Sequence, residues 1–118
     1  MARRQGSPLV GEVEQLVLIA VLRLGEDAYA VPIRSLVHDE AGIALSRGAV
    51  YVTLERLEAK GYVTSWFTEP IAVRGGKARR MFRLTAAGLA ATRASKDAVD
   101  RLAAGTSLAR PLPHRVKS

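Results

Sequence analysis

The spacing of the apolar residues changes twice along the chain, and this limits the possible folds more than any other feature of the sequence. Apolar residues recur every three or four positions up to Lys60, alternate between Val63 and Leu84, and recur at the longer spacing again after Thr85. The longer spacing indicates amphipathic helices, and the alternation indicates strands. We therefore predict helices over residues 11–24, 31–40, 46–60 and 85–104, a short extended piece at residues 43–45, and strands over residues 63–69 and 78–84.

Glycines and a capping residue mark the ends of these segments. Gly25 and Gly61 follow helices, Ser46 is a good N-cap, and Gly75-Gly76 lie between the two strands. Three helices followed by a hairpin are the arrangement of a winged helix-turn-helix, whose third helix enters the major groove of DNA and whose hairpin is the wing. The predicted fold class is therefore mainly α with a small β hairpin: a winged helix-turn-helix with three helices, a two-stranded wing and a further C-terminal helix.

The positive charge is concentrated in the last part of the chain. Residues 1–73 carry seven Lys and Arg against nine acids, whereas residues 74–118 carry eleven against two, so the whole surplus of +7 lies after Val73. A charged loop that contacts only solvent can have the same composition. The position of this basic segment at a hairpin, however, favours binding to a polyanion such as DNA. The predicted DNA-binding residues of the wing are Arg74, Gly75, Gly76, Lys77, Arg79 and Arg80.

The start of the third predicted helix offers a second set of contacts. The free N–H groups and the dipole of a helix N-terminus suit a phosphate, and Arg47 is able to reach a phosphate or a guanine edge. The small side chains that follow allow a helix to lie deep in a groove. Each of these residues also has an ordinary structural reading, as a cap, a core aromatic or a surface position. The candidates are Ser46, Arg47, Gly48, Ala49, Tyr51, Val52 and Thr53.

Composition argues against several other classes. The chain has no Cys and two His, so it offers no thiol nucleophile, no disulfide and no three-histidine metal site. Its longest apolar run, residues 16–22, is much shorter than the roughly 20 residues that span a bilayer. The acidic pairs Glu12/Glu14 and Glu55/Glu58 have no partner base or nucleophile. We expect no enzyme activity, catalytic residue, metal, cofactor or membrane segment, and we expect a cytoplasmic, nucleoid-associated protein.

Three segments resemble the PadR-like family of winged-helix transcriptional regulators. GEDAYAVPI at residues 25–33 resembles the start of that family's second helix, SRGAVYVTLERLEAKG at 46–61 its recognition helix, and RGGKARRMFRLTAAG at 74–88 its wing. The resemblance covers about residues 9–92. The chain departs from the family at Ala30, where Gly is frequent, at Met81, where Tyr is common, and at Val52, where Pro is frequent and where the base readout is affected.

The resemblance implies a homodimeric repressor of the short subfamily, in which the first and fourth helices form the dimer interface. It also implies that Tyr51 faces DNA. Some short relatives hold aromatic drugs between the two fourth helices, against a Trp of that helix. The fourth helix here has no aromatic residue, which argues against such a site, and a small aromatic effector is kept only as an alternative. The implied interface residues are Val13, Leu16, Val17, Ala20, Leu89, Val99 and Leu102.

The predicted organisation has four parts. They are a flexible basic arm at residues 1–8, a winged-helix DNA-binding domain at 9–84, a C-terminal dimerisation helix at 85–104 and a disordered tail at 105–118. The predicted function is sequence-specific binding of double-stranded DNA at a pseudo-palindromic operator. The alternatives are a winged-helix module that binds an acidic protein and a nonspecific binder of RNA or chromatin, although single-stranded RNA is usually read by aromatic platforms that this fold lacks.

Overall fold

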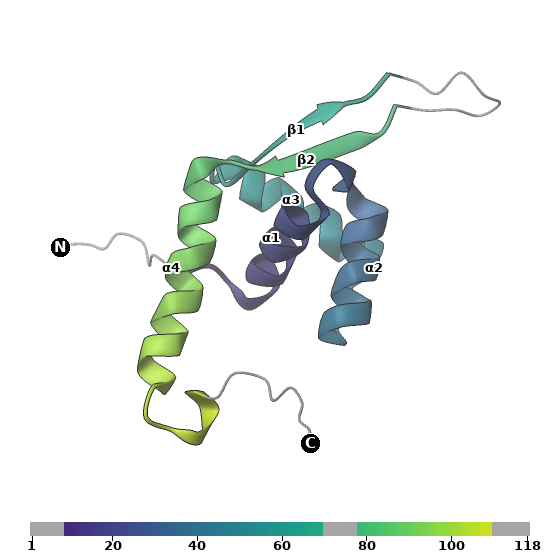
Figure 1. Ribbon diagram of the computed structural model, residues 1–118. Helices are drawn as coiled ribbons and strands as arrows, with labels where there is room; N and C mark the ends of the chain where they lie inside the picture. Colours follow the sequence, from purple (N-terminus) through teal and green to yellow (C-terminus); the bar gives the residue numbers. More distant parts are fainter. Residues whose placement is uncertain (1–8, 70–77, 110–118) are drawn as a thin grey trace.

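The computed structural model describes residues 9–69 and 78–109. Within these ranges the predicted helices and strands are all present, with ends within two residues of the predicted ones (Figure 1). Helices α1, α2 and α3 lie below a hairpin of β1 and β2, and α4 runs along one side. The elements are α1 (Glu12–Leu24), the 3-10 turn η1 (Gly25–Asp27), α2 (Ala30–Ala41), α3 (Arg47–Ala59), β1 (Val63–Phe67), β2 (Arg80–Leu84), α4 (Ala86–Ala103) and the 3-10 turn η2 (Ser107–Ala109).

Side-chain caps define where α3 and α4 begin. The Ser46 hydroxyl accepts the N–H of Ala49 at 3.0 Å at the start of α3, as predicted. The Thr85 hydroxyl accepts the N–H of Gly88 at 2.9 Å at the start of α4. Each cap satisfies one of the backbone donors that a helix N-terminus leaves without an intrahelical partner. The first residues of α3 and α4 are therefore well defined.

Helix α1 is the centre of the hydrophobic core and contacts α2, α3, α4 and β2. Its Val17 and Leu18 have no exposed surface, and Ala20 and Val21 are almost as buried. This explains the apolar residues on the inner side of α1, whereas Ile19 and Leu22 are 39% and 51% exposed. The other side chains with at most 1% exposure in this core are Ala28, Ile33, Val50, Leu54, Leu57, Val63 and Phe82.

The hairpin pairs β1 with β2 in antiparallel register, from Val63 opposite Leu84 to Phe67 opposite Arg80. On the other edge of β2 there is no third strand in the described residues. One backbone hydrogen bond is formed there, from the Phe82 N–H to the Ala28 carbonyl at 2.9 Å. The edge partner of β2 is thus Ala28, and residues 43–45, predicted to be extended, form no strand.

One side chain of β2 is more buried than its position in the strand suggests. Alternation along β2 predicts that Met81 faces outward, but only 8% of its surface is exposed. Phe82 belongs to the core cluster and Met81 does not, so Met81 lies on the outer face as predicted. It is nevertheless buried there, with Trp66 directly opposite it on β1.

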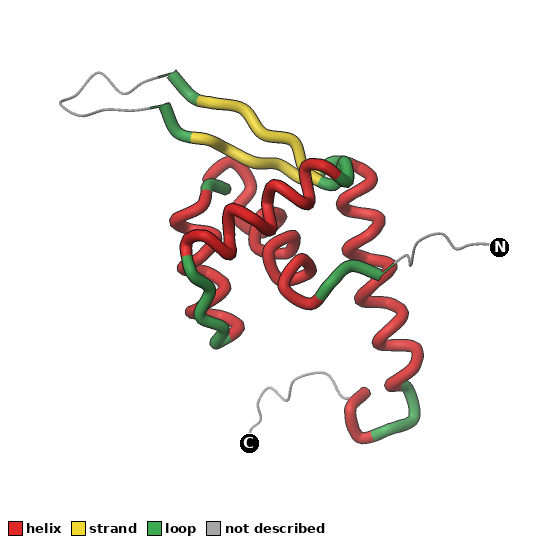
Figure 2. Tube along the Cα trace, turned by 180° about the vertical axis from the view of Figure 1, so that it is seen from behind, coloured by secondary structure: helices red, strands yellow, loops and turns green. Residues whose placement is uncertain are grey.

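Helix α4 is attached to the body over its first half and continues beyond it (Figures 1 and 2). The Val10 N–H donates to Ser95 Oγ at 2.9 Å, and Gln15 Nε2 donates to the Thr92 carbonyl at 3.1 Å. After α4 the chain forms η2, so residues 105–109 have defined structure where a disordered tail was predicted. Residues 1–8 and 110–118, the predicted arm and the rest of the tail, lie outside the described residues.

Candidate nucleic-acid interface

The first half of α3 presents an open surface beside the start of α2. Tyr51 and Val52 are 42% and 51% exposed, and Ser46, Arg47 and Gly48 are also exposed. A groove of about 330 Å³ separates the two helix starts and is lined by Arg34, Arg47 and Tyr51 together with Ala30, Val31 and Val50. The arrangement brings together six of the seven predicted recognition-helix residues, with Ala49 half-buried.

Arg34 was not among the predicted residues. Its Nε donates to the Leu45 carbonyl at 2.7 Å, which ties α2 to the turn before α3. The guanidinium therefore lies beside Arg47 at the groove. The only signal in the sequence was its charge, since no motif assigns it to the recognition element.

Thr53 does not belong to this surface. It is 6% exposed, and its hydroxyl donates to the Ala49 carbonyl one turn earlier at 2.7 Å. Thr53 lies three residues after Val50 and one before Leu54, so it shares their buried face. Because its hydroxyl is satisfied within the helix, its burial carries little cost. The prediction that Thr53 contacts DNA is corrected by this geometry.

The wing is described only up to its tip. Arg74, Gly75, Gly76 and Lys77 lie outside the described residues. Arg79 is exposed, and its guanidinium carbon lies 4.2 Å from the centroid of the Tyr29 ring, a cation–π distance. The Arg79 charge is therefore held next to the start of α2, and no ion pair neutralises it among the residues that the structure describes.

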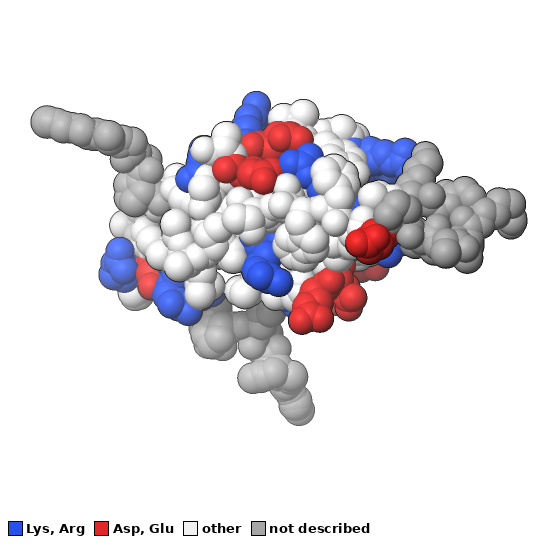
Figure 3. All heavy atoms as spheres, turned by 90° about the horizontal axis from the view of Figure 1, so that it is seen from above, with Lys and Arg blue, Asp and Glu red and all other residues white. Residues whose placement is uncertain are grey.

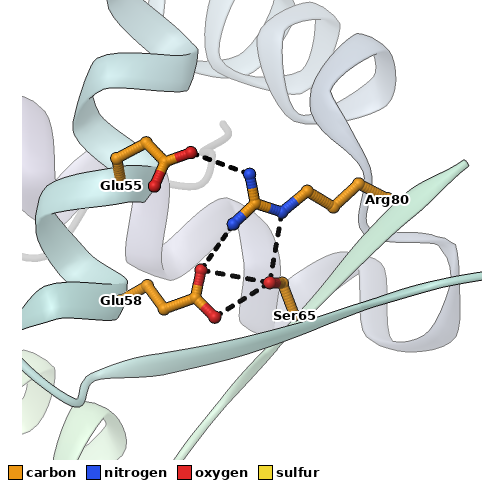
Figure 4. Close-up of polar contacts among 4 residues, drawn as sticks. All are labelled: Glu55, Glu58, Ser65 and Arg80. Carbon is orange, nitrogen blue, oxygen red and sulfur yellow. Dashed lines mark hydrogen bonds and ion pairs between the residues drawn. The ribbon is translucent and has the colours of Figure 1, made fainter.

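Arg80 has a different environment from Arg79 (Figure 4). Its Nη1 lies 2.8 Å from Glu55 Oε2, its Nη2 lies 2.6 Å from Glu58 Oε1, and its Nε donates to Ser65 Oγ at 3.1 Å. Ser65 in turn donates to Glu58, at 2.8 Å from Oε2. The hydrogen bond with Glu55 raises the pKa of Arg80 above its ordinary value, against the opposing effect of burial. We call these four residues the Arg80 cluster.

Charges of both signs lie next to one another on the upper face of the molecule. On the face shown in Figure 3, the described basic side chains are interspersed with acidic ones and form no continuous patch. The Arg80 cluster is one cause of this mixture of charges. Arg80, which the sequence assigns to the wing, is compensated by two carboxylates of α3. Glu55 and Arg80 are 25 positions apart, so no local spacing reveals their contact.

A second ion pair fixes the far end of α3 to α1. Lys60 Nζ lies 2.9 Å from Glu14 Oε2, and Glu14 Oε1 accepts the Gly11 N–H at 3.0 Å. Burial opposes the charged form of Glu14, but these two hydrogen bonds lower the pKa of its carboxyl below the ordinary value. The pair contributes to the position of α3 against the body.

The predicted dimer-interface residues fall into two groups. Val17 and Ala20 lie in the core of the single chain, at 0% and 3% exposure, so they have almost no surface to offer a partner. The other five are accessible: Val13, Leu16 and Leu89 are half-buried, and Val99 and Leu102 are 63% and 85% exposed. A groove of about 450 Å³ between α1 and α4 includes Leu16 and Val99 in its lining.

Within residues 9–69 and 78–109, no group of His, Asp and Glu has the arrangement of a metal site. In the same residues no helix is long and apolar enough to cross a bilayer. The fold and the open start of α3 together define a winged helix-turn-helix protein.

The sequence model of the transcriptional regulator PadR-like family matches residues 18–94, and the chain belongs to this family. The family consists of transcription regulators and not of enzymes. None of the curated proteins compared with the chain matches it.

Solved structures show the same fold. A PadR family transcription regulator from Clostridium difficile R20291 is 21% identical, with a TM-score of 0.66, over 79% of this chain and 95% of that chain. A transcriptional regulator from Clostridium thermocellum is 19% identical, with a TM-score of 0.66, over 77% of this chain and 85% of that chain. Bacillus subtilis PadR in complex with operator DNA is 23% identical, with a TM-score of 0.54, over 91% of this chain and 55% of that chain.

Proposed function

We propose that the protein is a homodimeric repressor that binds a pseudo-palindromic operator, with α3 in the major groove and the wing on the DNA backbone. The observation that carries this proposal is the open, capped start of α3, where Arg47 and Arg34 flank the exposed Tyr51. The Bacillus subtilis relative, whose structure contains operator DNA, supports the same use of the fold here. A DNA-bound regulator would act in the cytoplasm, at the nucleoid.

The proposed base-reading surface is the exposed side of α3, with Thr53 omitted. Tyr51 and Val52 face outward after the first turn, and the capped N-terminus is suited to a phosphate. The wing contributes Arg79 and the tip residues of the sequence prediction. The proposed DNA contacts are Ser46, Arg47, Gly48, Ala49, Tyr51, Val52, Arg74, Gly75, Gly76, Lys77 and Arg79.

The proposed dimer rests on α4. Val99 and Leu102 lie three residues apart on one side of this helix and are largely exposed, which is unusual for large apolar residues unless a partner covers them. A second copy of α4 would cover this side and the groove against α1. In a two-fold dimer the recognition helices meet half-sites about 10–10.5 base pairs apart, or a multiple of that distance.

A mobility-shift assay on the DNA upstream of the gene tests the proposal. We expect a preference over random DNA at moderate salt, and Tyr51→Ala should reduce operator binding more than nonspecific binding. Arg23→Ala is the control, because Arg23 pairs with Glu40 at the opposite end of α2 from the groove. If the wild-type protein has no preference for its own upstream DNA, the proposal fails and the acidic-partner alternative gains support.

Sedimentation tests the dimer separately. Leu102→Asp should shift the protein from dimer to monomer at micromolar concentration, because the new carboxylate would be buried against the partner helix. Leu108→Asp is a control of equal charge at a residue that is 82% exposed and lies beyond α4. A wild-type monomer at this concentration would contradict the assignment.

A further inference from the structure

We propose that Arg80 is a positioning residue that fixes the wing against α3 through Glu55 and Glu58, and that it is not a phosphate contact. The inference rests on the proposed DNA-binding function. It replaces the direct DNA contact that the sequence suggested for Arg80, the second of two consecutive arginines.

Three separate nitrogens of the Arg80 guanidinium are engaged within the chain. Nη1, Nη2 and Nε contact Glu55, Glu58 and Ser65 at 2.8, 2.6 and 3.1 Å. Its side chain is 22% exposed, compared with 60% for that of Glu55. A phosphate would have to displace two charge-assisted hydrogen bonds, which are stronger than neutral ones.

The charge of the Arg80 cluster also disfavours a phosphate. One guanidinium faces two carboxylates, so the cluster has a net charge of −1. Arg79, the preceding residue, differs in this respect: its guanidinium lies over Tyr29, and within residues 9–69 and 78–109 it forms no ion pair with a carboxylate. Two consecutive arginines, Arg79 just before β2 and Arg80 at its first position, therefore have different electrostatic surroundings.

The position of Arg80 in the hairpin gives the contact its effect. Arg80 and Phe67 form the last pair of the β1–β2 ladder before the tip. The guanidinium carbon also lies 5.1 Å from the centroid of the Phe82 ring. Arg80 therefore connects the outer end of both strands with the second half of α3, and this connection holds that end of the described hairpin against the body.

A charge-matched variant separates positioning from phosphate contact. Arg80→Met combined with Glu58→Gln removes one positive and one negative charge, so the net charge of the cluster stays at −1 while the connection is lost. Arg79→Met is the matched control in the adjacent position. Operator affinity is measured against salt concentration, well below the unfolding midpoint of each variant, because each phosphate contact contributes about −0.9 to the slope of log K against log salt.

Trp66 provides a readout that needs no DNA. It is the only tryptophan, it follows Ser65 in β1, and it is 39% exposed. Quenching of its fluorescence by acrylamide therefore reports on how firmly the hairpin is held in the free protein.

We expect the Arg80→Met/Glu58→Gln variant to bind operator about tenfold more weakly, a typical coupling within one hydrogen-bond network, with an unchanged salt slope and increased Trp66 quenching. Arg79→Met should lower the slope by about 0.9 and leave quenching unchanged. A lowered slope with unchanged quenching in the Arg80 variant would overturn the inference, as would unchanged affinity and quenching. If the wild-type protein fails to prefer operator, the proposed function fails, and unchanged quenching would still refute the positioning role.

Discussion

Replacement of Gly88 by Ala tests the attachment of α4 to the body. Gly88 lies in the first turn of α4, and a Cβ added there would come within 1.9 Å of the Tyr62 carbonyl oxygen and 2.8 Å of its carbonyl carbon. Real Cβ atoms do not approach other atoms closer than 3.0 Å, so α4 and the Tyr62 main chain must separate by at least about 1 Å. Both sides of the contact are backbone, so no side-chain rotation relieves it.

The expected loss of stability follows from three contributions. Overpacking of this kind costs about 3 kcal/mol. The Thr85 N–H donates to the same Tyr62 carbonyl at 3.0 Å, and losing this bond costs about 1 kcal/mol. Alanine returns about 1 kcal/mol through its higher helix propensity. The free energy of unfolding should therefore fall by about 3 kcal/mol, or about 15 °C in the melting temperature of a domain of this size.

Urea unfolding at a fixed protein concentration measures this change as a lower midpoint with an unchanged m-value. Gly48→Ala is the matched control: Gly48 also lies in the first turn of a helix, but the nearest atom to its added Cβ is Ser46 Oγ at 4.0 Å. The control should be neutral or up to about 1 kcal/mol more stable. If both alanine variants are equally stable, the close approach of α4 to Tyr62 does not exist in solution.

Three further changes test individual contacts. Ser46→Ala should lower the free energy of unfolding by about 1 kcal/mol through loss of the α3 cap, whereas Ser35→Ala, an exposed position within α2, should change it by less than 0.5 kcal/mol; equal effects in chemical unfolding would contradict the capping role. Thr53→Val should leave operator preference in a competition assay unchanged, because the side chain is buried; an altered preference would return Thr53 to the DNA surface. Because the folded-state pKa of Glu14 lies below its ordinary value of 4.5, its ion pair with Lys60 stabilises the fold fully above pH 4.5 and is lost as the pH falls through the folded pKa. Glu14→Gln should therefore cost about 1 kcal/mol at pH 7 and progressively less below pH 4.5 in unfolding titrations, and a cost independent of pH would refute this linkage.

The elements could be predicted because their signals are local. Ser46 caps the helix that it was expected to cap, and the change from helical to alternating spacing after Gly61 marks the hairpin. Such signals depend on neighbouring residues and on backbone preferences, so one sequence suffices to interpret them.

The side-chain environments were less predictable because they depend on contacts between distant elements. Thr53 was placed on the DNA surface because its side chain is small, but it is buried in the chain and its hydroxyl finds an acceptor within α3. Val17 and Ala20 were assigned to a partner chain, although α1 is surrounded by the other elements of the same chain. Arg80 was counted as a free charge, and only the folded chain brings Glu55 and Glu58 beside it.

The main-chain contact at Gly88 has a mechanical consequence. Tyr62 follows α3 by three residues, so the base of α4 rests on the segment that leads out of α3. We therefore expect a tilt of α4 to move the end of α3 with it. The 18 residues of α4 rise about 27 Å, so a tilt of about 5° at one end displaces the other by about 2 Å. Hydrogen bonds to base edges tolerate far less displacement than this, so in the proposed dimer a small change of angle between the two protomers would be sufficient to disengage both α3 helices from DNA.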